Sequence, residues 1–286
     1  MKKTCVVTGG TSGIGFATSY QLAEQGCVVI VVGRNAEKCK VITEEIKKST
    51  GNTNIHYVVG DLSLKKDVLR IAKSLSKFEI NVLINNAGCI MVREETTSEG
   101  IEKTFALNHL GYFLLTNLLL DNLEQNTPSR IINVASEAHR FVSLSLETIE
   151  NEKDFSLSNI FKVYGRSKLC NLLFTYELAK RLRSSNITVN AFHPGIVATK
   201  LFSSNGFKGK ILNFFLGVAS IGNTPNKPAV NLVYLALDET VSEMTGKYII
   251  GKNPVKSSDI SYQSDLQKEL WNKSESITGT EFPVIR

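Results

Sequence analysis

The chain has 286 residues, of which 42% are hydrophobic and 21% are charged, proportions that are ordinary for a soluble globular protein. Lysine and arginine exceed aspartate and glutamate by 33 to 27, a net charge of +6, but the basic residues are spread along the chain, so no nucleic acid partner is expected. No stretch approaches the ~20 apolar residues of a membrane-spanning helix, and the first residues lack the apolar core of a signal peptide. We therefore expect a cytoplasmic protein.

The cysteines and histidines of the chain do not suggest a metal site or a disulfide framework. The five cysteines are scattered and form no CxxC pair, and none of the four histidines has ligand spacing to another metal-binding residue. We therefore expect no metal, and reduced cysteines.

Short apolar runs rich in β-branched residues alternate with longer segments of helical period. The runs occupy residues 4–10, 26–33, 54–61, 80–88, 129–136, 186–195 and 246–251. Because they are apolar almost throughout, both faces of the sheet that they form should be covered. The intervening segments are long enough for right-handed crossover helices. The pattern predicts an α/β fold: a Rossmann-type doubly wound parallel sheet in three layers, with residues 1–286 as a single domain.

A glycine-rich turn, "VVTGGTSGIG", follows the first predicted strand and opens the first predicted helix. Glycines at such a junction let a pyrophosphate approach the backbone amides, and the helix N-terminus favours an anion. The residues expected to form this nucleotide-binding turn are Gly9, Thr11, Ser12, Gly13, Ile14 and Gly15. The alternative is a tight turn without a ligand.

The end of the second predicted strand indicates which nucleotide would bind. The sequence there is "VIVVGRNAEK", with Gly33 followed by Arg34 and Asn35 and without an acidic residue at the strand end. An acid would bind a ribose 2′-hydroxyl, whereas arginine suits a 2′-phosphate. The sequence favours NADP(H); an exposed charge at a helix start is the alternative for Arg34.

The stretch "YGRSK" places Tyr164 and Lys168 four residues apart. Residues with this spacing share one face of a helix, and an ammonium near a phenol lowers the phenol pKa from its usual ~10. Such a tyrosine could donate or accept a proton. The spacing is common, so a solvated helix face is the alternative when the pair is taken alone.

Five ordered motifs together resemble the short-chain dehydrogenase/reductase family. They are "TGGTSGIG", "NNAG" at 85–88, "NVAS" at 133–136, "YGRSK" and "HPGIVAT" at 193–199. The resemblance runs from residue 4 to about 251, and we expect only the segment after Gly251 to lie outside it. It implies a dinucleotide-dependent oxidoreductase that transfers a hydride.

The resemblance also implies roles for individual residues. Tyr164 would be the general acid/base, Lys168 would lower its pKa and bind the nicotinamide ribose, and Ser136 would hydrogen-bond the substrate oxygen. Asn108 would hold a water for proton relay. Further residues would line the cofactor: Asp61 and Leu62 at the adenine, Asn86, Ala87 and Gly88 beside the sheet, and Pro194, Gly195, Ile196 and Thr199 at the carboxamide. Ordinary turn or capping chemistry is the alternative for this last group.

Within the family, three segments resemble the retinol dehydrogenase-like branch: "NHLGYFLLTNLLL", "SEAH" and "YGRSKLCNLLF". This implies NADP(H)-dependent interconversion of a lipophilic alcohol and its aldehyde or ketone. The apolar anchor of membrane-attached members is not evident. Cys170, two residues after Lys168, leaves a protochlorophyllide-reductase-like enzyme as an alternative, or it is a small buried apolar residue. A non-catalytic nucleotide-binding regulatory protein is a further alternative.

Three regions have more general predictions. Residues 199–227 would form a substrate lid, and 199–220 could contact an anionic membrane peripherally. Helices around 101–125 and 158–183 would mediate a homodimer or homotetramer. Residues 252–286 form a C-terminal extension in which "SDLQKELWNKSES" predicts an amphipathic helix.

Overall fold

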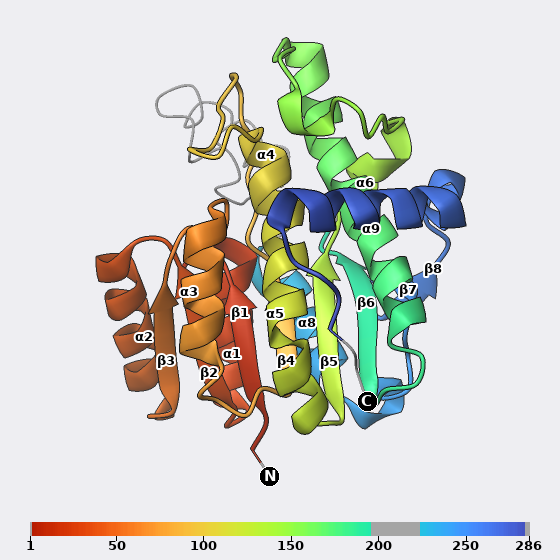
Figure 1. The fold of residues 1–286 in the computed structure, drawn as a ribbon. Helices are drawn as coiled ribbons and strands as arrows, with labels where there is room; N and C mark the ends of the chain where they lie inside the picture. Colours follow the sequence, from red (N-terminus) through yellow and green to blue (C-terminus); the bar gives the residue numbers. More distant parts are fainter. Residues whose placement is uncertain (1, 196–223, 284–286) are drawn as a thin grey trace.

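The structure is a computed structural model that describes residues 2–195 and 224–283. One sheet runs in the order β3-β2-β1-β4-β5-β6-β7-β8 (Figure 1). All neighbouring pairs are parallel except β7 and β8. The strands are Thr4–Thr8 (β1), Val28–Gly33 (β2), Ile55–Val59 (β3), Val82–Asn85 (β4), Ser129–Val134 (β5), Ile187–His193 (β6), Lys247–Ile250 (β7) and Asn253–Val255 (β8). Seven of them were predicted, and β8 was not.

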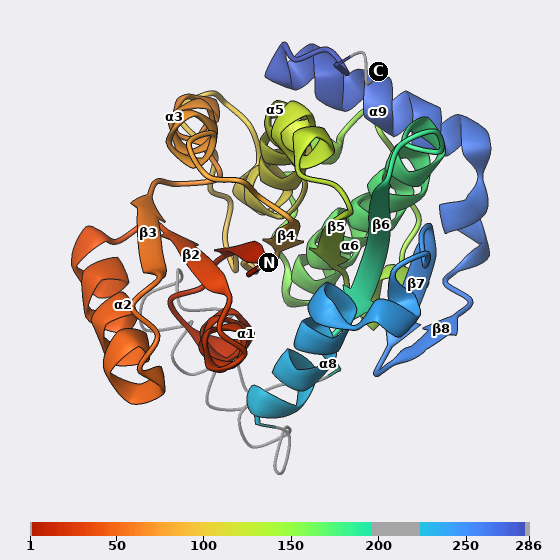
Figure 2. The ribbon, with the colours of Figure 1, turned by 90° about the horizontal axis from the view of Figure 1, so that it is seen from below.

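Helices cover both faces of the sheet. Helices α1, α2 and α8 lie on one face, and α3, α5 and α6 lie on the other (Figure 2). Their bounds are Gly13–Glu24 (α1), Ala36–Thr50 (α2), Lys65–Leu75 (α3), Lys103–Phe105 (α4), Gly111–Gln125 (α5), Leu157–Arg181 (α6), Asn226–Leu237 (α8) and Ser264–Thr278 (α9). The predicted three-layer, doubly wound α/β fold is confirmed. The order in which successive strands are added to the sheet reverses between β1 and β4, and the ligand crevice of such folds falls at this point.

The core explains why the strands show no alternation of apolar and polar residues. In β1, Val6 packs into the cluster beneath α3 and α5, whereas Cys5 and Val7 pack into the cluster beneath α1 and α8. Successive side chains point to opposite faces of a strand. Because each face is buried under helices, both sets are apolar, and the continuous apolar run follows.

The C-terminal extension packs against the domain. Helix α9 crosses α6 in Figure 1, and its buried Trp271 lies with its ring centroid 5.0 Å from that of Phe113 and 5.8 Å from that of Phe174. The Arg181 guanidinium lies 4.1 Å from the centre of the Trp271 ring. The predicted amphipathic helix is confirmed. It covers part of one helix face that we had assigned to subunit contacts, and the dimer or tetramer stays a prediction.

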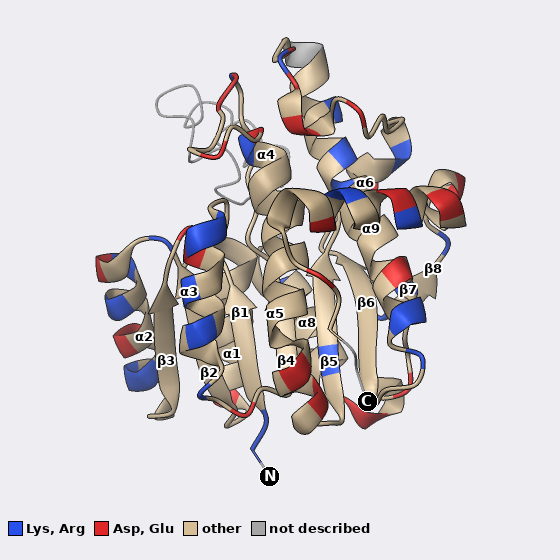
Figure 3. Cartoon of the chain, viewed as in Figure 1, with Lys and Arg blue, Asp and Glu red and all other residues tan. Residues whose placement is uncertain are grey.

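Charged residues of both signs are interspersed over the helices in Figure 3. This distribution agrees with the scattered basic residues of the sequence. Among the described residues, no helix is both long and apolar enough to span a bilayer. The same residues contain no group of three or more metal-binding side chains that could hold an ion.

Candidate active site

The glycine-rich turn needs glycine because backbone and side chains meet closely there. Gly9 has a φ of +66°, and a Cβ on it would lie 2.9 Å from Ala87 Cα. A Cβ on Gly15 would lie 2.6 Å from Asn86 Nδ2. The first turn of α1 therefore packs directly on the turn and on the loop after β4, which brings two of the predicted cofactor-binding segments together.

The N-terminus of α1 offers backbone amides to an anion. Ser12 is the N-cap residue, but its side chain makes no capping hydrogen bond, and the first turn carries no acidic residue. By contrast, the Asn35 side chain caps α2 by accepting a hydrogen bond from Lys38 N at 2.8 Å. The first amides of a helix lack intrahelical partners. The turn from Ser12 to Gly15 thus fits the pyrophosphate of a dinucleotide.

The end of β2 leaves no room for an acidic side chain at Gly33. A Cβ at this position would lie 2.8 Å from both Thr11 Cγ2 and Cys39 Sγ. Arg34 follows, and its charge acts on the Cys89 thiol, which lies in the loop after β4. Thr11 therefore packs against the end of β2, and Arg34 lies within electrostatic reach of the loop after β4.

The side chain of Asp61 forms hydrogen bonds within its own turn. Its Oδ1 accepts hydrogen bonds from Ser63 N at 2.9 Å and from Ser63 Oγ at 2.7 Å. This is an Asx-type turn, the alternative considered for this residue. Leu62 is buried, and its carbonyl oxygen would lie 2.5 Å from a Cβ on Gly111. Both residues therefore shape the third strand end, and their predicted contact with adenine stays a prediction.

The loop after β4 is held to β1. Thr8 Oγ1 accepts hydrogen bonds from Asn86 N at 2.8 Å and from Ala87 N at 3.0 Å, and Asn86 Nδ2 donates to Thr8 O at 2.8 Å. A Cβ on Gly88 would lie 3.2 Å from Asn108 Oδ1 and 3.7 Å from Lys168 Nζ. The glycine of the NNAG motif thus lies against two of the predicted catalytic residues.

Asn108 lies in a π-helical turn, Ala106–Leu110, that interrupts the helix leading into α5. Such turns often occur at functional sites. Its side chain accepts a hydrogen bond from Cys89 N and donates to Cys89 O, both at 2.9 Å, and donates to Ser167 Oγ at 3.0 Å. Asn108 therefore joins the loop after β4 to helix α6.

Tyr164 and Ser136 meet at the carboxyl end of β5. Ser136 follows β5 and begins the 3₁₀ helix η2, Glu137–Phe141, where its Oγ accepts a hydrogen bond from Ala138 N at 3.3 Å. The Ser136 side chain also lies near the Tyr164 phenol. Burial raises the pKa of Tyr164 to about 12, although Ser136 acts in the opposite direction. The phenol is thus a proton donor in this state.

Lys168 is buried beside Tyr164 on the same face of α6. Its Nζ donates to Val134 O at 2.7 Å and lies 5.7 Å from the centre of the Tyr164 ring and 5.6 Å from that of Tyr112. Burial lowers the pKa of Lys168 to about 7. The shared face was predicted. The expected lowering of the Tyr164 pKa is not found, because burial outweighs any effect of the ammonium.

Two histidines hold the turn that carries Ser136, and the sequence analysis assigned them no role. His139 Nδ1 lies 2.6 Å from Ser136 O, and Glu137 N donates to His193 Nδ1 at 3.3 Å. Burial lowers the pKa of His193 to about 4. The position of His139 in "SEAH" was the available signal, but its second partner, Ser258, lies 119 residues away in the sequence.

Other predicted residues lie beside this centre or beyond the described residues. Pro194 and Gly195 follow β6, and Gly195 has a φ of +80°. Ile196, Thr199, the predicted membrane contact at 199–220 and most of the lid at 199–227 lie outside the described residues. Cys170 is fully buried in a cluster with Phe105 and Leu173, and burial raises its pKa strongly. This favours the small buried apolar residue over a reductase cysteine.

The comparisons with known proteins agree with this fold. The model of the short chain dehydrogenase family matches residues 3–146. Human "Retinol dehydrogenase 13" is 36% identical over 99% of this chain and 87% of its own length, and human "Polyprenol dehydrogenase" is 34% identical over 97% and 85%. A solved structure of "a putative uncharacterized protein from Mycobacterium Paratuberculosis" has a TM-score of 0.77 and 30% identity, over 99% of this chain and 95% of its own.

The chain belongs to the short-chain dehydrogenase/reductase family, an oxidoreductase family that uses NAD(P). Its likeness to retinol dehydrogenases confirms the predicted branch. The expectation that the segment after Gly251 lies outside the resemblance is wrong, because the match covers 99% of the chain. That segment is built into the domain, as the packing of α9 shows, and so it belongs to the shared fold.

Proposed function

We propose that the protein is an NADP(H)-dependent oxidoreductase that interconverts a lipophilic alcohol and its aldehyde or ketone. The observation that carries the proposal is the convergence of Asn108, Ser136, Tyr164 and Lys168 beside the glycine-rich turn. Bound NADPH would supply the hydride. The turn from Ser12 to Gly15 would hold its pyrophosphate, and Lys168 would hold the nicotinamide ribose.

The side chains of the centre suit the reduction of a carbonyl. Ser136 would hydrogen-bond the carbonyl oxygen and stabilise the developing alkoxide, and Tyr164 would donate its proton to that oxygen. Asn108, fixed between the loop after β4 and α6, would hold a water for proton relay. Pro194, Gly195, Ile196 and Thr199 would contact the carboxamide, and residues 199–227 would close over the substrate.

Two observations support NADP(H) and a lipophilic substrate. Gly33 leaves no space for the acid that would bind a ribose 2′-hydroxyl, and Arg34 follows it with a planar cation suited to a 2′-phosphate. The relatives are named for retinol and polyprenol, which are both isoprenoid alcohols. We propose long isoprenoid aldehydes as the first substrates to test. The five free, buried cysteines fit action in the cytosol.

The test is the oxidation of NADPH, with NADH in parallel, against aldehydes and ketones that range from short polar ones to isoprenoid ones. The proposal expects turnover with NADPH and the apolar carbonyls. The Arg34→Ala variant should raise the KM for NADPH ~10-fold or more, the worth of one or two charge-assisted hydrogen bonds, and leave the KM for NADH within about twofold. A wild-type preference for NADH would contradict the cofactor assignment. Tight NADPH binding without any turnover would favour the non-catalytic alternative.

A further inference from the structure

The turn that carries Ser136 is fastened to the C-terminal extension through the buried imidazole of His139 and through Arg140. His139 lies in η2, three residues after Ser136, and is 0% exposed. Its Nδ1 lies 2.6 Å from Ser136 O, and its Nε2 lies 3.1 Å from Ser258 N. The imidazole therefore bridges two backbone groups that are 122 positions apart in the sequence, the difference between 258 and 136.

The partners determine where the imidazole carries its proton. The amide of Ser258 can only donate, so Nε2 must accept, and the carbonyl of Ser136 can only accept, so Nδ1 must donate. A neutral imidazole with the proton on Nδ1 satisfies both bonds. Burial lowers the pKa of His139 below its ordinary value and outweighs the hydrogen bond to Ser136 O, which acts in the opposite direction. The neutral form is therefore present at neutral pH.

The far side of this bridge is itself held rigidly. Ser257 Oγ lies 2.6 Å from the hydroxyl of Tyr176, a residue of α6, and Ser257 N donates to the Tyr262 hydroxyl at 3.1 Å. Arg140, which lies in η2 with His139, forms a second link to the extension by donating from Nη2 to Lys256 O at 2.6 Å. The edge of the imidazole also meets Tyr248 of β7, with ring centroids 5.1 Å apart. Ser258 is thus a fixed point relative to the helix that carries Tyr164.

We propose that His139 is a positioning residue for Ser136. It ties the Ser136 carbonyl to the C-terminal extension and thereby holds the serine hydroxyl within reach of Tyr164. The inference rests on the proposed function, because the placement of Ser136 matters for turnover only if Ser136 and Tyr164 act on a carbonyl. The C-terminal extension would then have a second role besides covering α6, because it would hold the turn that carries Ser136 in place.

Three substitutions separate the two hydrogen bonds. His139→Asn keeps a side-chain N–H near the position of Nδ1, His139→Gln can present an oxygen near the position of Nε2, and His139→Phe keeps only the ring. We expect the Phe and Gln variants to lower kcat about tenfold, the effect of one ordinary hydrogen bond, with the KM for NADPH within about twofold. The Asn variant keeps a donor for Ser136 O but loses the link to Ser258, so its kcat should fall as well. His56→Asn, on the distant strand β3, is the matched control and should behave as wild type.

The outcomes distinguish this inference from the proposed function. Wild-type turnover that persists unchanged in His139→Phe would overturn the role of His139 alone. Weaker NADPH binding in the three variants, together with the lower kcat, would indicate a purely structural histidine and would also overturn it. A wild-type protein that reduces no carbonyl would overturn the proposed function and the positioning role together.

A spectroscopic readout tests the geometry independently of turnover. The chain has four histidines, so ¹⁵N NMR of their side chains can be assigned by single substitutions. We expect His139 to be protonated on Nδ1 and His193 on Nε2, because His193 Nδ1 accepts the bond from Glu137 N. An Nε2 proton on His139 would contradict the bridge to Ser258.

Discussion

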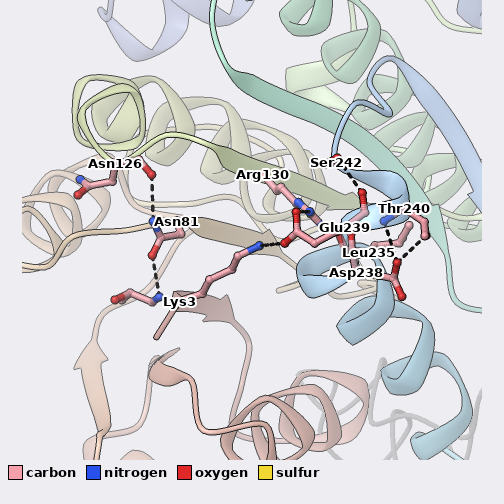
Figure 4. A network of polar contacts seen from close by, with 10 residues as sticks. Lys3, Asn81, Asn126, Arg130, Leu235, Asp238, Glu239, Thr240 and Ser242 are labelled. Carbon is pink, nitrogen blue, oxygen red and sulfur yellow. Dashed lines mark hydrogen bonds and ion pairs between the residues drawn. The ribbon is translucent and has the colours of Figure 1, made fainter. Parts of the chain in front are cut away.

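The two ends of the parallel strands each bury a cation in a different way. At the amino end, Arg130 of β5 donates to Leu235 O at 3.0 Å and to Asp238 O at 2.8 Å, and it faces Glu239 at 4.0 Å (Figure 4). At the carboxyl end, Lys168 donates to Val134 O at 2.7 Å. Among the described residues, no carboxylate lies within ion-pair distance of Lys168.

The different surroundings of Arg130 and Lys168 indicate a structural role for the first and a chemical role for the second. Arg130 binds carbonyls at the C-terminus of α8, where a helix attracts cations, and a guanidinium stays charged when buried. Lys168 has spare donors and a pKa lowered to about 7, and Tyr164 beside it has a pKa raised to about 12. Perturbed groups that gather in a crevice are typical of active sites. The arrangement agrees with a stabilising role for the amino end and with the reactive role that we propose for the carboxyl end.

Ser136→Ala should have a large effect on the reactive end. Removing one donor to a developing oxyanion costs about 100-fold to 1000-fold in kcat. The free energy of unfolding should change by less than about 1 kcal/mol, because the Ser136 carbonyl keeps its bond to His139. Steady-state kinetics and urea unfolding check both values. A variant with near wild-type kcat would remove Ser136 from the proposed mechanism.

Arg130→Met should have the largest effect on the stabilising end. It leaves two carbonyls of the α8 terminus without their donor, and we expect the free energy of unfolding to fall by about 3 kcal/mol. Because the change lies far from the crevice, kcat below the unfolding transition should stay within about twofold. Urea denaturation measures the first quantity. A loss below about 1 kcal/mol would show that the buried guanidinium contributes little.

The buried Lys168 should make stability depend on pH. Its pKa of about 7 in the folded protein lies below its ordinary value of 10.5, so the unfolded chain binds more protons between these values and stability rises with pH. Relative to Lys168→Met, the wild type should gain about 1.5 kcal/mol between pH 7 and 8.5. Urea unfolding at several pH values tests this. Parallel curves for the two proteins would contradict the lowered pKa.

Lys3→Ala should have the smallest effect, although it touches the same network as Arg130 (Figure 4). Lys3 Nζ lies 3.2 Å from Glu239 Oε1, but the Glu239 side chain is 77% exposed. Exposed ion pairs contribute about 0–1 kcal/mol, so we expect a loss below about 0.5 kcal/mol in urea unfolding. A loss that matches Arg130→Met would mean that burial does not decide the strength of these contacts.

Local sequence patterns were sufficient to predict most of the sheet and the candidate site. The apolar runs predicted seven strands, because strands covered on both faces are apolar throughout. The glycine-rich sequence correctly indicated a turn between β1 and α1. Tyr164 and Lys168 were placed correctly on one face because helical spacing is local.

Features that depend on distant contacts were missed. The role of His139 requires Ser258, and the burial of Arg130 requires the end of α8, neither of which a local pattern indicates. The burial that raises the pKa of Tyr164 was also missed, because burial depends on tertiary packing. Strand β8 has three residues, one of them Pro254. A run of this length is too short to show the alternation of side chains that indicates a strand.

The most direct test of the central claim is to measure kcat and the free energy of unfolding on one preparation of Tyr164→Phe. The account predicts that turnover of NADPH with an apolar aldehyde falls by about 1000-fold or more, because the proton donor is removed. It predicts that the free energy of unfolding stays within about 1 kcal/mol and that NADPH still binds, because the ring beside Lys168 remains. Turnover that survives the substitution, or that is lost only together with the fold, would contradict a tyrosine-based reaction at the carboxyl end of the sheet.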